Sequence, residues 1–487
     1  MTPQEPVRPG RSSVEGAPVP TLASGGVSSP AADPSIAAPP PGVPAETLAP
    51  ANRGWLDRRI DTHGFNQRYG RKAFPVHSTF FFGEMALFSF LILVLTGIYL
   101  GLIYIPSNAE IDVNGQSLPQ AYASVQLIES IPIANILRGV HHWGAHLMVA
   151  SVLLHLIRIY FTGTYRYPRE LNWVIGMVLL GFTLIVAFVG YALPYDSYAV
   201  TATGIGYGIA RSIPWIGHIV AELFFGGVFP TLGSVPRLYT IHVFIMPALI
   251  TALISAHMLL VIKQKHTQPG YAKRLAEPGR VLGVPFWPYQ GLLAGQLLLL
   301  MFGGLFLLSA FVPIHPLEAY GPPGAGASDV KPDWYLMWIY GFLKLIPAGA
   351  TFRFLGGNIG PEFLGGILFP ALLIGLVTAA PWLDRTNRVV GRRYEYLEPV
   401  LQAGIRYAVG IAVLAFLGMT YVAAYYDEIG IPLGLMWLLL FAVPVAVGLF
   451  AFAVARAFAG RNERFDPTAD DDPLAPSVAA ARPGHGD

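Results

Sequence analysis

Stretches of about twenty predominantly apolar residues recur along this chain and limit what it can fold into. A helix that crosses a bilayer needs about 20 such residues, because the hydrocarbon core is about 30 Å thick and a helix rises about 1.5 Å per residue. Eight stretches meet this requirement, at residues 79–103, 139–161, 173–195, 239–262, 289–312, 363–383, 403–425 and 432–457. We therefore predict an all-α integral membrane protein with eight transmembrane helices.

Composition agrees with this class and limits the kinds of partner and metal site that the chain can have. Charged residues make up 12% of the chain, about half of the roughly 25% found in soluble domains. The formal net charge of +2 gives no reason to expect a nucleic acid as a partner. Because cysteine is absent, the chain cannot hold a disulfide or a thiolate-bound iron–sulfur cluster, and any metal must be bound by His, Met or carboxylates.

Loop charges predict the orientation. An even number of spans places both termini on one side, and the loops on that side carry 17 Lys and Arg residues. The other side, which we call outer, carries six: Arg138, Arg211, Arg237, Lys331, Lys344 and Arg353. The positive-inside rule then places both termini in the cytoplasm. Residues 1–50 are rich in Pro, Ala, Gly and Ser and lack a hydrophobic core pattern, and residues 459–487 are similar, so we predict disordered cytoplasmic extensions there.

Paired histidines in the second and fourth spans are the strongest functional feature. His141 and His155 are 14 residues apart, and His242 and His257 are 15 apart. At about 100° per residue, each pair lies on one side of its helix, about 21–23 Å apart along the axis. Since both helices run from the outer to the inner surface, His141 comes opposite His242, and His155 opposite His257. Two opposed imidazoles can hold a porphyrin iron, and a six-coordinate haem suits electron transfer.

Other interpretations of these histidines exist. A single intramembrane His is more often a polar residue hydrogen-bonded between helices. Four at matching depths on two parallel helices favour the haem interpretation. The neighbouring His142 and His146 lie about 220° and 180° from His155 around the helix, so neither shares the ligand face.

Glycines and arginines near the histidines fit the same interpretation. Gly83 and Gly97 in the first span, and Gly176 and Gly190 in the third, repeat the interval of 14 residues. A haem edge needs helix backbone without side chains at its level, although ordinary helix packing also uses Gly. Three arginines lie three to five residues from a ligand His and could pair with haem propionates or anchor the membrane interface: Arg138, Arg158 and Arg237.

With these motifs the chain resembles cytochrome b of the cytochrome bc complexes over about residues 55–425. The resemblance rests on the four His and four Gly, Arg-x-x-His at Arg138–His141, Pro247, GYALP at Gly190–Pro194, SIPWIG at Ser212–Gly217 and PDWY at Pro332–Tyr335. KQKHTQ at Lys263–Gln268 and the fused eight-span layout are most similar to the actinobacterial type. The resemblance implies an N-terminal four-helix domain with two non-covalent b-type haems at 51–275, and a C-terminal four-helix domain with the PDWY loop at 276–458.

The implied activity is that of a quinol–cytochrome c reductase. Quinol would be oxidised at an outer site, electrons would cross through the two haems to an inner quinone-reducing site, and protons would be translocated. The outer site would use Asp333 and Tyr191, with Pro332, Trp334, Tyr335 and Gly190 around them. The family motif usually has Glu in place of Asp333; actinobacterial members also carry Asp, which favours menaquinol. At the inner site Lys263 and His266 lie at the correct edge, but we interpret them as a solvated basic loop.

Partners and location follow from the same resemblance. It implies a Rieske iron–sulfur protein, a c-type cytochrome subunit, a homodimer of the complex and a bacterial plasma membrane, and it allows a terminal oxidase in a supercomplex. Two other functions remain open at this point. A dihaem membrane anchor of a dehydrogenase or hydrogenase would share the four His but not PDWY in an eight-span layout. A transporter with proton-relaying His would bind no haem.

Overall fold

The computed structural model describes residues 54–66, 70–75, 77–270, 272, 282–314, 321–323, 330–384 and 393–459. The terminal extensions predicted to be disordered therefore lie outside the described residues. The chain forms two units, Met1–His63 and Gly64–Asp487. The first contains α1 (Trp55–Ile60), and Asp57 of this helix accepts a hydrogen bond of 2.6 Å from the Thr62 hydroxyl. The helix α2 (Thr62–Phe65) follows in the chain.

Among the described residues, eight helices are long and apolar enough to span a membrane, which confirms the predicted number. The first four spans are Ser78–Gly101 with α3 (Phe81–Gly101), Pro132–Phe161 (α5), Glu170–Tyr191 (α6), and Ser234–Gln264 with α9 (Ser234–Thr240), the π-helical turn η4 (Ile241–Ile245) and α10 (Met246–Gln264). The last four are Phe286–Phe311 with α12 (Gly291–Phe311), Pro361–Thr378 with α15 (Pro361–Phe363) and α16 (Phe369–Thr378), Gly404–Ala423 (α18), and Leu433–Phe458 in α19 (Leu433–Ala459).

Shorter elements fill the loops, and some of them were not predicted. The loop at 196–238 holds two helices, α7 (Ser197–Arg211) and α8 (Gly217–Phe225), besides the start of α9. The loop at 313–362 holds α14 (Met337–Lys344) and a hairpin of β5 (Phe352–Phe354) and β6 (Gly357–Ile359). Unforeseen are the hairpin of β2 (Glu110–Val113) and β3 (Gln116–Pro119) with α4 (Gln120–Ser130), the pair β1 (Ala73–Phe74) and β4 (Val284–Pro285), and α17 (Ala380–Leu383).

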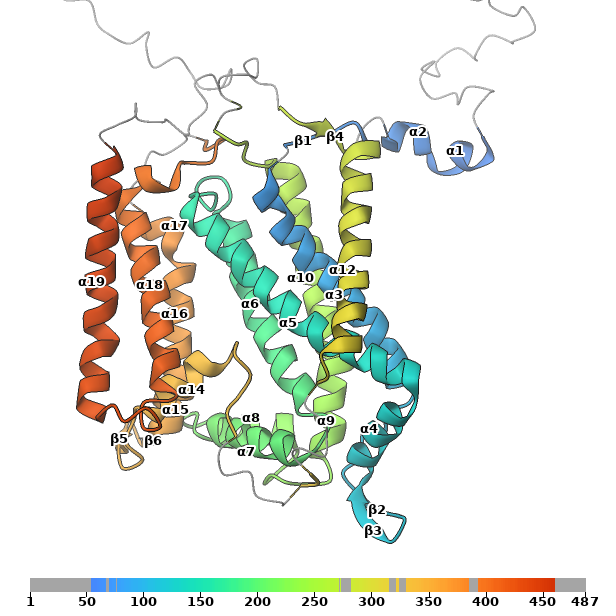
Figure 1. Ribbon diagram of the computed structural model, residues 1–487, viewed down its shortest axis with the longest axis vertical. Coiled ribbons are helices and arrows are strands. Elements are labelled where there is room, and N and C mark those ends of the chain that lie inside the picture. The colour runs from blue at the N-terminus through green and yellow to red at the C-terminus, as the bar shows by residue number, and fades with distance from the viewer. Residues whose placement is uncertain are drawn as a thin grey trace, which may run out of the picture. The chain divides into compact units, whose positions relative to one another are not determined.

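Four helices of the second unit share one core. Buried Phe90 of α3, Met148 of α5 and Ile250 of α10 pack together with Leu179 and Phe182 of α6. Figure 1 shows α12 on the α3 and α5 side of this group, and α16, α18 and α19 on the other side of α6. The shared core fits the predicted N-terminal bundle, whereas the domain boundary near residue 275 stays a prediction.

Large apolar side chains remain exposed along the spans. Leu95, Leu299 and Phe450 are 69%, 72% and 72% exposed. A soluble protein rarely leaves so much apolar surface in water, but the hydrocarbon of a bilayer covers it without cost. The chain is a multi-pass membrane protein.

Candidate functional site

The structure brings the four predicted histidines together in two opposed pairs. The ring centroids of His141 and His242 are 6.2 Å apart, and those of His155 and His257 are 6.4 Å apart. A metal–imidazole bond is about 2 Å long, and a ring centre lies about 1 Å beyond its nitrogen, so two axial ligands of one metal have centroids about 6 Å apart. Both separations therefore fit one porphyrin iron between each pair.

The unequal spacing of the two pairs has a local cause. His242 lies in the π-helical turn Ile241–Ile245, which holds one residue more than an α-turn. The 15-residue interval to His257 therefore covers nearly the same rotation as the 14-residue interval from His141 to His155. Pro247 lies one residue beyond the turn, after Met246, and cannot donate a backbone hydrogen bond to Val243. The sequence motif contained both residues, but its periodicity alone did not indicate the turn.

Among the described residues, no group of three or more His, Asp or Glu side chains could hold a metal ion. This is expected for haem, because the porphyrin supplies four nitrogens and the protein only two axial ligands. The donor set of each pair is therefore complete for a b-type haem and incomplete for a bare zinc or iron ion.

Each of the four glycines faces a different imidazole. A Cβ atom placed on Gly83 would lie 3.1 Å from His155, and one on Gly97 would lie 3.2 Å from His141. On Gly190 it would lie 2.5 Å from His242, and on Gly176 it would lie 3.8 Å from His257. The backbone of α3 and α6 thus approaches the space between the histidines where side chains would intrude.

Two cavities surround the two pairs. The outer one, about 120 Å³, is lined by His141, His242 and Gly97, and the inner one, about 280 Å³, by His155, His257 and Gly83, among others. Met148 and Ile250 line both cavities and so form the layer between them.

The three predicted arginines differ in their surroundings. Arg138 forms an ion pair of 2.7 Å with Glu129, and Arg237 donates to the carbonyl of Gly233 at 3.2 Å. Arg158 lines the inner cavity, and its Nε and Nη2 atoms are buried without a hydrogen-bond partner. The guanidinium lies over the Phe80 ring, with Cζ 4.4 Å from the ring centroid, but these two nitrogens have no acceptor. A propionate-bearing group beside His155 would supply one, because a buried cation is stable only when it is paired.

The four candidate histidines differ in the surroundings of Nδ1. Nδ1 of His141 lies 2.9 Å from the Thr96 hydroxyl, and Nδ1 of His242 lies 3.0 Å from the Val186 carbonyl oxygen. Nδ1 of His155 and of His257 are buried without a hydrogen-bond partner. Thr96 was not identified from the sequence, although its position directly before Gly97 indicates that it lies near His141.

An apolar cavity of about 420 Å³ adjoins the PDWY turn. Its wall includes Tyr191 and Pro332 together with aliphatic and aromatic residues of α6, α7, α14 and α16. Asp333, Trp334 and Tyr335 adjoin this cavity without lining it, and Gly190 lies one residue before Tyr191. The buried Tyr335 hydroxyl donates to Asp333 Oδ2 at 2.8 Å. Burial and this carboxylate raise the pKa of Tyr335 well above its ordinary value.

A second contact fixes the turn from the opposite side. The Trp334 indole N–H donates to Nδ1 of His146 at 2.8 Å, and Nε2 of His146 lies 3.2 Å from Nε2 of His142. The sequence excluded His142 and His146 as haem ligands and gave them no other role. A polar role for His146 was therefore missed, and it depends on a neighbour 188 residues away in the chain.

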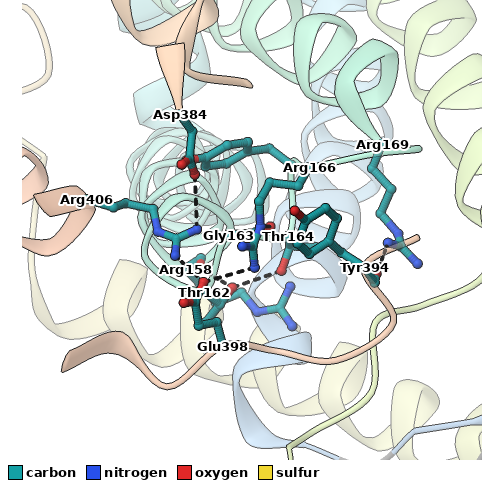
Figure 2. Close-up of polar contacts among 11 residues, drawn as sticks. Arg158, Thr162, Gly163, Thr164, Arg166, Arg169, Asp384, Tyr394, Glu398 and Arg406 are labelled. Atoms are coloured by element: carbon teal, nitrogen blue, oxygen red, sulfur yellow. Dashed lines mark hydrogen bonds and ion pairs between the residues drawn. The ribbon is translucent and has the colours of Figure 1, made fainter. Parts of the chain in front are cut away.

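The inner end of the bundle holds a buried cluster of charges (Figure 2). Arg166, which is 1% exposed, pairs with Glu398 at 3.0 Å, and Arg406 pairs with Asp384 at 3.3 Å. Arg169 donates to the Tyr394 carbonyl at 2.6 Å. These contacts join the loop after α5 to the segment that precedes α18.

Lys263 and His266, the two residues named for the inner site, differ in their exposure. Lys263 is exposed, as expected for a solvated loop. His266 instead lines the inner cavity, and its ring centroid lies 4.5 Å from that of Phe74. Burial, and then the nearby cations led by Lys72, lower the pKa of His266 to about 4. The interpretation of His266 as a solvated loop residue is therefore wrong.

Comparisons with known proteins agree with this geometry. Residues 146–322 match the family model described as cytochrome b(N-terminal)/b6/petB, and residues 323–438 match cytochrome b(C-terminal)/b6/petD. The cytochrome bc1 complex cytochrome b subunit of Streptomyces coelicolor is 33% identical over 74% of this chain and 67% of its own length. That of Mycobacterium leprae is 33% identical over 77% and 70%.

A solved structure shares the fold. A chain of a hyperthermophilic respiratory Complex III aligns with 82% of this chain and 99% of its own, with a TM-score of 0.61 and 22% identity. The actinobacterial resemblance predicted from the motifs is thus confirmed by relatives from that group. The two family matches and the identity across two thirds or more of these relatives establish that this chain belongs to the cytochrome b family.

Proposed function

We propose that this chain is the cytochrome b of a bacterial menaquinol–cytochrome c oxidoreductase, a proton-translocating respiratory enzyme of several subunits. The observation that carries the proposal is the presence of two opposed His pairs with centroid separations of 6.2 and 6.4 Å. One pair lies beside the PDWY end of the bundle and the other lies near the opposite end, so a path for electrons can cross the membrane.

His141 and His242 would hold the outer b-type haem, and His155 and His257 the inner one. When bound, these haems supply one-electron transfer between the two faces. Gly83, Gly97, Gly176 and Gly190 would leave room for the ring edges, and Arg158 would pair with an inner propionate. Arg138 and Arg237 already have partners in Glu129 and Gly233, which favours their role as anchors of the outer loops.

Quinol would be oxidised in the apolar cavity at Tyr191 and Pro332, whose walls suit a ring with a prenyl tail. Asp333 acts as the general base: Tyr335 holds Oδ2 at 2.8 Å and orients the carboxylate, and Oδ1 takes the quinol proton and later releases it outward. Trp334 fixes the turn through His146. Because Asp is one methylene shorter than Glu, the quinol or one bridging water must come closer to the turn.

Quinone would be reduced at the rim of the inner cavity. His266 lies there between Phe74 and Phe80, with ring centroids 4.5 and 6.3 Å away. With its pKa lowered to about 4, His266 is neutral at physiological pH and can donate a hydrogen bond to a quinone carbonyl.

Partners and orientation complete the proposal. Each quinol gives up two electrons, and one of them would enter the outer haem. The chain has no cysteine, so the iron–sulfur cluster that accepts the other electron must belong to a Rieske partner, which would pass it to a c-type cytochrome. The excess of Lys and Arg in the inner loops supports cytoplasmic termini in the bacterial plasma membrane. A dimeric complex, with or without a bound terminal oxidase, accords with this arrangement.

A reduced-minus-oxidised spectrum and a quinol assay test the proposal. The purified complex should show two b-haem equivalents, and His257→Leu should remove one of them. Asp333→Asn should lose most menaquinol:cytochrome c activity while retaining both haems. Absence of b-haem bands would favour a transporter, and full activity of Asp333→Asn would favour a dihaem anchor.

A further inference from the structure

The two His pairs differ in how their non-ligating nitrogens are held. His141 and His242 both have a hydrogen-bond partner at Nδ1, at 2.9 and 3.0 Å, whereas His155 and His257 have none. Nδ1 of His257 faces the Asn172 carbonyl without forming a hydrogen bond of normal geometry. The presence or absence of an Nδ1 partner therefore distinguishes the outer pair from the inner pair. It does not follow the helix, because each helix carries one histidine of each kind.

Which group donates in the hydrogen bond between Thr96 and His141 follows from a second hydrogen bond that the Thr96 hydroxyl makes. A threonine hydroxyl has one hydrogen, and Thr96 Oγ1 lies 2.8 Å from the Ile92 carbonyl, which can only accept. The oxygen of Thr96 is therefore left to accept from His141, which also faces the Leu93 carbonyl, so His141 carries its hydrogen on Nδ1. The same holds for His242, because the Val186 carbonyl is an acceptor. Both outer imidazoles thus present an unprotonated Nε2 to the space between the helices.

A hydrogen-bond acceptor at Nδ1 makes an imidazole more basic and a stronger donor to a metal bound at Nε2. Stronger donation stabilises ferric iron over ferrous iron, since the ferric form carries one more positive charge. The inner pair lacks this effect, and the Arg158 cation beside it favours the ferrous form. Both differences lower the outer reduction potential relative to the inner one.

We propose that Thr96 is a positioning residue that, with the Val186 carbonyl, sets the reduction potential of the outer haem below that of the inner haem through the Nδ1 nitrogens of His141 and His242. The proposal rests on the proposed function, because it takes the four histidines as haem ligands. Electron flow from the outer to the inner haem is then favoured by hydrogen bonds built into α3 and α6.

Thr203 offers a matched control on α7. It is 2% exposed and donates to the Ala199 carbonyl at 2.6 Å, as Thr96 does to Ile92 at 2.8 Å. It lines neither of the two cavities around the histidine pairs, so Thr203→Val removes a buried hydroxyl without removing an acceptor from an imidazole or changing the wall of a haem cavity.

The test is a redox titration of the b-haem absorbance in membranes that contain the whole complex. Thr96→Val keeps the shape of the side chain and removes the acceptor, and we expect the lower of the two midpoints to rise while the upper one stays. Thr96→Ala should act in the same direction if the valine variant does not assemble. Thr96→Ser should restore the wild-type midpoint, and Thr203→Val should leave both midpoints unchanged.

The inference is overturned if neither Val nor Ala at position 96 moves a midpoint, if the upper midpoint moves instead, or if Thr96→Ser or Thr203→Val shifts the lower one as far as Thr96→Val. A wild-type complex without two b-haem waves would instead refute the proposed function, so the two failures are distinguishable.

Discussion

Adding one methyl group at Gly190 should weaken the outer haem site far more than the same change at Gly176 weakens the inner site. A Cβ on Gly190 would lie 2.5 Å from Cε1 of His242, whereas one on Gly176 would lie 3.8 Å from Cε1 of His257. Carbon atoms in contact are about 3.5–4.0 Å apart, so Gly190→Ala forces a displacement of about 1 Å and Gly176→Ala forces none.

The expected magnitude follows from this overlap. Overpacking of a filled site costs about 1–3 kcal/mol, which corresponds to a loss of about 5- to 150-fold in haem affinity at the outer site. Both changes gain about 1 kcal/mol from the better helix propensity of alanine. Because that gain is common to the two variants, their difference isolates the clash with His242.

The assay is haem content per complex after purification and after a graded detergent or heat challenge. Gly190→Ala should lose one haem equivalent first, and Gly176→Ala should keep two, as the wild type does. Equal retention in the two variants would refute the reasoning, because the van der Waals overlap at His242 would then have no consequence for binding.

Three further outcomes are expected. Arg406→Met leaves Asp384 and Glu398 buried without this partner, so the complex should lose about 3 kcal/mol of stability, measured as a lower midpoint of thermal unfolding; an unchanged midpoint would contradict a structural role. His146→Leu and Trp334→Phe each remove the 2.8 Å hydrogen bond worth about 1 kcal/mol, so each should lower kcat/KM for quinol by about fivefold, and the double variant should lose no more than either one. The folded pKa of His266 lies below its unfolded value of 6.5, so its contribution to stability is present above pH 6.5 and is lost as the pH falls towards about 4; His266→Phe should flatten the stability profile in that window.

The spans and the pairing of the histidines could be predicted because both depend on local periodicity. An apolar run of about twenty residues needs a helix, and a helix fixes which side His141 and His155 share. The limits of the spans were less predictable where polar residues begin a helix: α5 starts at Pro132, not near 139, because Asn135 and Arg138 lower the hydropathy of its first turns.

Contacts between distant segments could not be predicted from the sequence. Nothing near His146 in the sequence indicates that Trp334, 188 residues away, donates to it. The π-helical turn at His242 was also missed, since a single extra residue leaves the apolar pattern intact. These features depend on tertiary packing, which periodicity does not encode.

The charged cluster at the inner end also bears on how the chain is assembled. Arg166 and Arg169 belong to the part that matches the N-terminal family model, and Asp384, Glu398 and Arg406 belong to the part that matches the C-terminal one (Figure 2). Since buried ion pairs depend strongly on geometry, they fix the register between these two parts more than they add to stability. Arg169 also lines the inner cavity, so the same contacts that join the two parts shape the place where we put quinone reduction. A change that loosens this junction should therefore disturb the inner site before it affects the outer histidine pair.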